Sequence, residues 1–96
     1  MIVRDGSRLR VQGPVTIGNV MSVLEAGLQQ LNPELKQIDF SGLDEVDSAA
    51  ISMVLEWLRV SKSRNLQLCV VNMPDNMKSL ASVYGVLELI PFCGEG

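Results

Sequence analysis

The chain has 96 residues, 47% of them hydrophobic and 20% charged, which is the composition of one folded domain and not of a disordered chain. Eight basic and 11 acidic residues give a net charge of −3, so we expect no basic surface for nucleic acid or anionic lipid. The sequence has no histidine, which excludes a Ser-His-Asp triad, a histidine-assisted cysteine nucleophile and a histidine-ligated metal.

Residues 1–15 have the alternation of a β-hairpin. Asp5-Gly6 supplies the turn, and the apolar residues after it are spaced by even steps. Those residues are Leu9, Val11 and Val15. Thr16 is then expected to cap a helix that runs to about Leu31 and ends before Asn32-Pro33.

The middle of the chain predicts a strand, a loop and a long helix. Lys36–Ser41 alternates, with Ile38 and Phe40 on one side, and the strand is expected to stop at Gly42. Residues 43–47 are interpreted as an acidic loop. A helix is predicted from about Ser48 to about Arg64.

The last third predicts a strand and a helix. Residues 66–71 are almost wholly apolar, which favours a central strand. Pro74 fits the first turn of a helix that Gly85 closes, with Tyr84 on its apolar face. A short element over 87–90 follows, and residues 92–96 are expected to fray. Strands that alternate with helices indicate an α/β fold with a mixed or mostly parallel sheet.

Two cysteines are present, Cys69 and Cys93. A disulfide scaffold of this length usually has more, and Cys69 lies in an apolar strand, so we expect free thiols. The chain has neither a signal-peptide pattern at Met1 nor an apolar stretch of membrane-spanning length. These features predict a cytoplasmic protein with no direct membrane insertion.

Ser48 is the distinctive residue of the sequence, because it follows an acidic turn and opens the long helix. Asp47 or Ser48 can accept hydrogen bonds from the free N–H groups of the first helical turn, and a plain helix cap explains both. A phosphate on Ser48 would gain from the helix dipole. However, four acids lie within nine residues and would repel it: Asp39, Asp44, Glu45 and Asp47.

The helix after Ser48 has an apolar arc wider than one sheet face requires. A core stripe is flanked on one side by Ala49, Met53, Trp57 and Val60. One interpretation is a thick core, and the other is a partly exposed apolar strip that docks a partner. The acids have no calcium-loop spacing, and neither phosphate-binding glycine motif occurs. We therefore expect no metal, no cofactor and no enzymatic activity.

The chain resembles the STAS domains, the family of the anti-sigma-factor antagonists. The matching residues are Asp39-Phe40-Ser41-Gly42 and Asp47-Ser48-Ala49-Ala50, although the family usually has Gly where this chain has Ala50. The segment from Met73 to Ile90 is similar to the end of the MlaB-type subunit of the bacterial ABC transporter that maintains outer-membrane lipid asymmetry. The resemblance implies one STAS domain over residues 1–96, with a sheet of four to five strands and helices mainly on one face.

The resemblance also implies a function. A non-catalytic adaptor is expected to bind and regulate the ATPase subunit of a phospholipid-transport ABC system, peripheral to the inner membrane through that partner. The expected contact residues are Asp44, Glu45, Asp47, Ser48, Ala49, Ser52, Met53 and Glu56. One alternative is an anti-sigma-factor antagonist that a kinase switches by phosphorylating Ser48. A second alternative is a nucleotide-binding STAS module.

Overall fold

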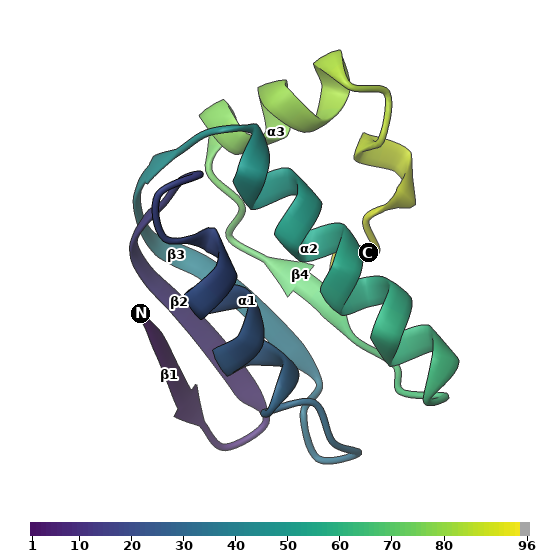
Figure 1. Cartoon of the computed structure of the whole chain (residues 1–96). Helices are drawn as coiled ribbons and strands as arrows, with labels where there is room; N and C mark the ends of the chain where they lie inside the picture. Colours follow the sequence, from purple (N-terminus) through teal and green to yellow (C-terminus); the bar gives the residue numbers. More distant parts are fainter. Residues whose placement is uncertain (95–96) are drawn as a thin grey trace.

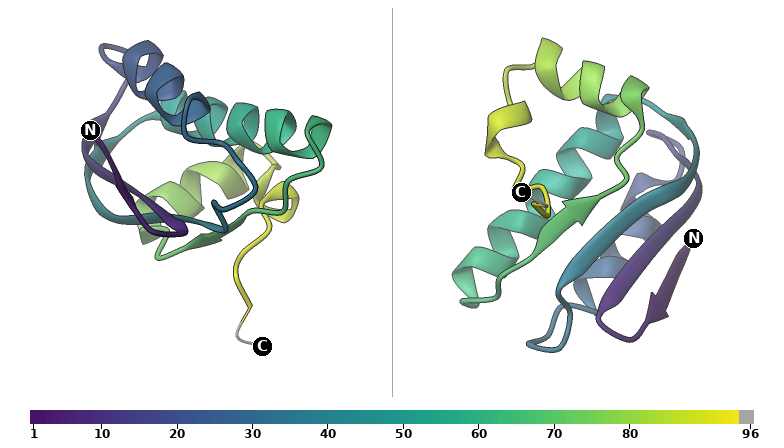
Figure 2. Two further views of the ribbon diagram at one scale, coloured as in Figure 1. Left: turned by 90° about the horizontal axis from the view of Figure 1, so that it is seen from below. Right: turned by 180° about the vertical axis from the view of Figure 1, so that it is seen from behind.

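The computed structural model of the chain describes residues 1–94. The chain forms a four-stranded sheet in the order β1-β2-β3-β4, in which β1 is antiparallel to β2 and the other neighbours are parallel. Figures 1 and 2 show how the helices connect the strands. The predicted α/β class and mixed sheet are confirmed. The elements are β1 (Ile2–Asp5), β2 (Arg8–Val15), α1 (Val20–Leu28), β3 (Gln37–Val46), α2 (Ser48–Ser63), β4 (Cys69–Val71), α3 (Asp75–Val83) and the 3-10 turn η1 (Leu87–Leu89).

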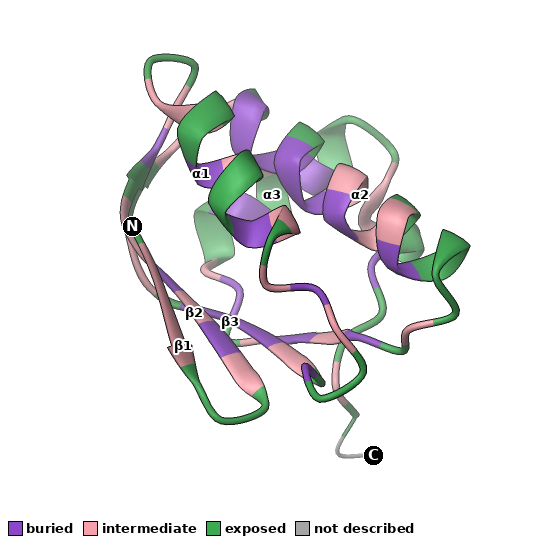
Figure 3. Cartoon of the chain, turned by 60° about the horizontal axis from the view of Figure 1, so that its bottom comes forward, coloured by how far each residue is buried: buried purple, intermediate pink, exposed green. Residues whose placement is uncertain are grey.

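The core lies between the sheet and the helices, which pack on one of its faces (Figure 3). Strand residues with even spacing point into this layer, as the sequence alternation predicted. The largest fully buried apolar side chains on the strands are Leu9, Val11, Val15, Ile38, Phe40 and Val70. The prediction that the helices pack mainly on one face of the sheet is confirmed.

The contact between α1 and α2 depends on a glycine. Trp57 of α2 is fully buried, and its indole N–H donates to the backbone oxygen of Leu24 at 2.9 Å. A Cβ at Gly27 would overlap the indole ring. Gly27 weakens α1 as an isolated helix, but it lets the helix lie directly on Trp57.

Helix α1 is shorter than the sequence predicted, and the predicted cap at Thr16 is wrong. The helix begins at Val20 with Asn19 as its N-cap residue. Thr16 instead forms a turn, because its hydroxyl accepts the N–H of Gly18 at 3.3 Å and its own N–H donates to the Asn19 side chain at 2.9 Å. This turn leaves Ile17 80% exposed.

The predicted loop over residues 43–47 is wrong, because β3 continues to Val46. Strand β2 runs alongside as far as Val15 and supplies the hydrogen-bond partners that the isolated sequence does not reveal. The pairing has two register irregularities, one between Arg10 and Gln12 and one between Gly13 and Val15, and the second accommodates Pro14. Gly42 lies where a Cβ would come 2.9 Å from the Gln12 side chain, so the strands approach closely there. The acidic residues therefore lie on the end of a strand.

The expectations for the C-terminal region need three corrections. Strand β4 lies at the edge of the sheet and not at its centre. Tyr84 was placed on the apolar face of α3, but it is the C-cap residue of that helix and is 57% exposed. Cys69 and Cys93 form a disulfide across a separation of 24 residues.

The disulfide was missed because apolar neighbours suggested that Cys69 is buried. In the structure Val70 points into the core and Cys69 is half-buried. Residues after Pro91 return beside β4, and Phe92 bridges Val70 in parallel. Residues 92–96 were expected to fray, but Phe92 is paired with β4. Residues 95–96 lie outside the described part of the chain.

Candidate functional site

The start of α2 is fixed by Asp47. One carboxylate oxygen accepts the N–H of Ala49 at 2.8 Å, and the other accepts the N–H of Ile17 at 3.0 Å. The first contact is a helix cap, and the second holds the β2–α1 turn against the start of α2. Both carboxylate oxygens of Asp47 are therefore used in hydrogen bonds to the backbone, which fix the start of α2.

Ser48 is exposed as the first residue of α2. The N–H groups of the next two residues are already donated to Asp47, from Ala49 to the carboxylate and from Ala50 to the backbone oxygen at 3.0 Å. A phosphate on Ser48 would have to compete with Asp47 for these donors. The Ser48 hydroxyl is thus exposed beside two helical N–H groups that already have acceptors.

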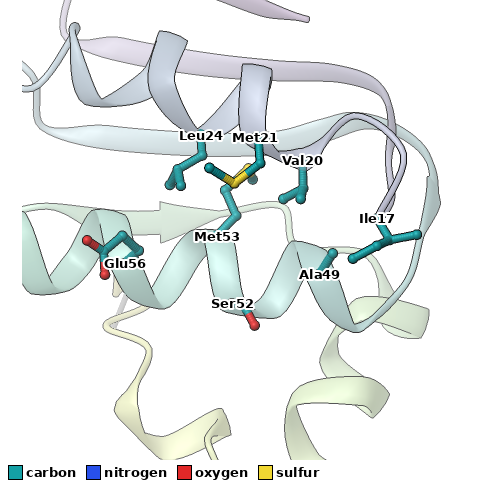
Figure 4. Close-up of a pocket in the computed structure, with 8 residues that line it drawn as sticks. All are labelled: Ile17, Val20, Met21, Leu24, Ala49, Ser52, Met53 and Glu56. Carbon is teal, nitrogen blue, oxygen red and sulfur yellow. The ribbon is translucent and has the colours of Figure 1, made fainter.

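An apolar groove lies between α1 and α2, and we call it the α1–α2 groove (Figure 4). Its volume is about 370 Å³. Met21 is 63% exposed at its rim, whereas Met53 is 1% exposed and points towards Met21 from below. The lining residues are Ile17, Val20, Met21, Leu24, Ala49, Ser52, Met53 and Glu56.

The interpretation of the α2 flank as an exposed strip is wrong for Met53 and Trp57. Both are covered by α1, and Ala49 is only 9% exposed, so the thick-core interpretation holds for all three. The exposed apolar side chains come instead from the other wall of the groove, Ile17 and Met21. Ile17 lies in the turn before α1 and Met21 in α1 itself, so the pattern within α2 could not have identified them.

A second groove lies on the opposite side of α2, and we call it the α2–α3 groove. It has a volume of about 300 Å³. Its lining residues are Ser48, Ile51, Ser52, Leu55, Tyr84 and Val86. Ser52 borders both grooves and in Figure 4 points away from α1. The exposed serines Ser48 and Ser52 thus form a narrow polar ridge between two apolar depressions.

The remaining predicted site residues are acids around this ridge. Asp44 and Glu45 are exposed at the end of β3. Glu56 borders the α1–α2 groove and accepts two hydrogen bonds from Arg59, at 3.0 and 2.6 Å. The hydrogen bonds and charge of Arg59 hold the pKa of Glu56 below its usual value. Unpaired negative charge is therefore concentrated near the β3 end of the site.

Within residues 1–94, no three acidic or cysteine side chains cluster closely enough to hold a metal ion. Nor does any helix in that range have the length and hydrophobicity to cross a membrane.

The chain is similar to several known proteins. It matches the family model described as "Mlab, STAS domain" over residues 2–91. The anti-sigma factor antagonist SpoIIAA in its unphosphorylated form superposes with a TM-score of 0.68 at 14% identity, covering 99% of this chain and 88% of SpoIIAA. A sulfate transporter family protein from Wolinella succinogenes gives a TM-score of 0.67 at 16% identity, covering 86% of this chain and 69% of that one.

A larger protein shares the fold over part of its length. The crystal structure of Mglu gives a TM-score of 0.57 at 20% identity over 78% of this chain, which spans only 20% of Mglu. No curated protein matches the sequence. The structural likenesses establish the fold, and the family model, which covers almost all of the chain, establishes the family. The chain belongs to the STAS domain family.

Proposed function

We propose that this STAS domain is a non-catalytic adaptor that binds and regulates the ATPase subunit of a phospholipid-transport ABC system. The observation that carries the proposal is the serine ridge at the start of α2, exposed between two apolar grooves. The MlaB description of the matching family model supports the choice of partner. On this proposal the domain lies at the cytoplasmic side of the inner membrane through its partner.

The surface sets the chemistry that the partner must offer. Two apolar side chains would fill the grooves on either side of Ser52, and removal of Ile17 and Met21 from water would favour binding. Small groups of the partner would have to face Ser48, which lines the α2–α3 groove at the start of α2. Basic groups of the partner would face Asp44 and Glu45, which speeds encounter more than it strengthens the final complex.

Ser48→Arg tests the ridge. The new side chain would project between the grooves and prevent close approach, so we expect capture of the ATPase subunit to weaken roughly 30-fold. The matched control is Ser63→Arg, the same change at an exposed position in the last turn of α2. Binding constants from titration of the purified ATPase subunit check the prediction. Equal loss in both variants, or no loss at Ser48, would argue against this surface.

Met21→Asp tests the α1–α2 groove separately. A carboxylate at the rim places charge against an apolar partner group, and we expect roughly tenfold weaker binding. Leu89→Asp is the control, because Leu89 is also 63% exposed and lies outside both grooves. The two variants should have matching thermal stability. If Leu89→Asp weakens the complex as much as Met21→Asp, the partner covers another face.

The exposed hydroxyl of Ser48 favours a second candidate function, an anti-sigma-factor antagonist switched by phosphorylation. The competition of Asp47 for the helical N–H groups makes it the weaker one. Incubation with an anti-sigma kinase and ATP, followed by intact mass measurement, distinguishes the two. Addition of one phosphate to the wild type and none to Ser48→Ala would replace the adaptor proposal with the switch.

A further inference from the structure

The Cys69–Cys93 disulfide lies away from both grooves, at the outer edge of β4. Among the described residues, the last buried apolar one is Ile90, and Pro91 begins the segment that returns along β4. Two backbone hydrogen bonds hold this segment. Val70 donates its N–H to the oxygen of Pro91 at 2.8 Å, and Cys93 donates its N–H to the oxygen of Val70 at 3.0 Å.

The other contacts of the segment are weak. Phe92 is 40% exposed, and its ring lies 5.8 Å from the ammonium group of Lys78. Such an exposed cation–π contact contributes little. Neither cysteine is fully buried, so a small thiol in solution has access to the bond. The disulfide is thus a covalent restraint on a segment that lies outside the hydrophobic core.

We propose that Cys69 and Cys93 form a redox clasp, in which the oxidised pair fixes residues 91–94 against β4 and the reduced pair releases them. Oxidation joins the two sulfurs and removes two protons and two electrons. Glutathione disulfide accepts them and becomes two glutathione molecules, and excess glutathione reverses the reaction. Release uncovers the outer N–H and C=O groups of Val70, while Ile90 and the residues before it stay packed.

Hydrogen exchange of the full-length chain, equilibrated in glutathione buffers of different ratio, tests the clasp. In the reduced state we expect the amides of Val70 and Cys93 to exchange at least tenfold faster, because their only acceptors are exchanged for water. The amides of Ile38 and Phe40 lie in the core and exchange only when the whole domain unfolds, so in the reduced state they should still exchange at least tenfold more slowly than those of Val70 and Cys93. Cys93→Ser should behave as the reduced wild type in every buffer, and so should Cys69→Ala.

Proteolysis by chymotrypsin gives an independent measurement. The reduced protein should be cut after Phe92 and lose the residues beyond it, whereas the oxidised protein should resist. Equal protection of the segment in both states would overturn the proposal, as would equal protection of Val70 and Ile38 in the reduced state. This inference does not depend on the proposed function, because its measurements need no partner.

Discussion

Asp39 is a buried carboxylate on the sheet face that the helices leave open. Only 3% of its side chain is exposed. Burial alone would raise the pKa of Asp39, but hydrogen bonds from the backbone of Ser41 at 2.8 Å and from Asn72 at 3.2 Å, with the charge of Arg8, lower it overall. The carboxylate is therefore ionised in the folded protein and links β3 to both of its neighbours.

This lowered pKa predicts acid sensitivity. A group whose pKa is lower in the folded than in the unfolded state stabilises the protein at neutral pH, and that contribution disappears as the pH falls below the usual value of 3.8. In Asp39→Asn an N–H₂ group replaces one of the carboxylate oxygens that now accept hydrogen bonds, so a donor would face a donor. We therefore expect the free energy of unfolding at pH 7 to fall by about 1–2 kcal/mol. At pH 3 the free energies of unfolding of the wild type and Asp39→Asn should differ by less. Urea titrations at both pH values check this, with the exposed Asp5→Asn as the control.

At the scale of elements, the packing of α1 on α2 is decided by Gly27. Alanine would normally improve a helix by about 1 kcal/mol, but here its methyl group would overlap the indole of Trp57. Gly27→Ala should therefore lower the free energy of unfolding by about 1–3 kcal/mol. In Gly18→Ala the nearest atom lies at 3.7 Å, an ordinary contact, so thermal unfolding of that variant should differ little from the wild type. Equal effects of the two changes would contradict the role given to Trp57.

The same elements show how far the sequence predicts the fold. Apolar periodicity placed the long helix at Ser48 and the core residues Ile38 and Phe40, because local spacing records which face of an element is buried. The extension of β3 to Val46 was not predictable in this way, since its partners lie on β2. Pairing between distant strands leaves no local period in the sequence.

The candidate site also contains residues that the sequence could identify and residues that it could not. Ser48 and Ser52 could be identified from one segment, because the acidic turn and helix start are adjacent in the chain. Ile17, Met21 and Tyr84 could not, since they reach the site only through the relative placement of three helices. Met53 does line the α1–α2 groove, but it was expected to be partly exposed and is 1% exposed. Its burial depends on where α1 lies, which the sequence of α2 does not show.

At the scale of the whole molecule, the chain is held together at two levels. The core between the sheet and the helices ends at Ile90, and the disulfide ties the segment beyond it to β4. A cross-link also acts on the unfolded chain, by limiting the conformations of the 24-residue separation that it closes. Reduction should therefore lower global stability even though the native core keeps its contacts.

The disulfide should contribute roughly 3 kcal/mol to the free energy of unfolding, the amount that a loop of this length removes from the entropy of the unfolded state. Urea titrations of the oxidised and reduced wild type measure the difference. The slope of the free energy against urea should rise on reduction, because an uncrosslinked chain exposes more surface when it unfolds. Cys93→Ser should have the same free energy of unfolding as the reduced wild type, and addition of reductant should not change it. A midpoint that stays the same on reduction would show that the cross-link does not restrict the unfolded chain.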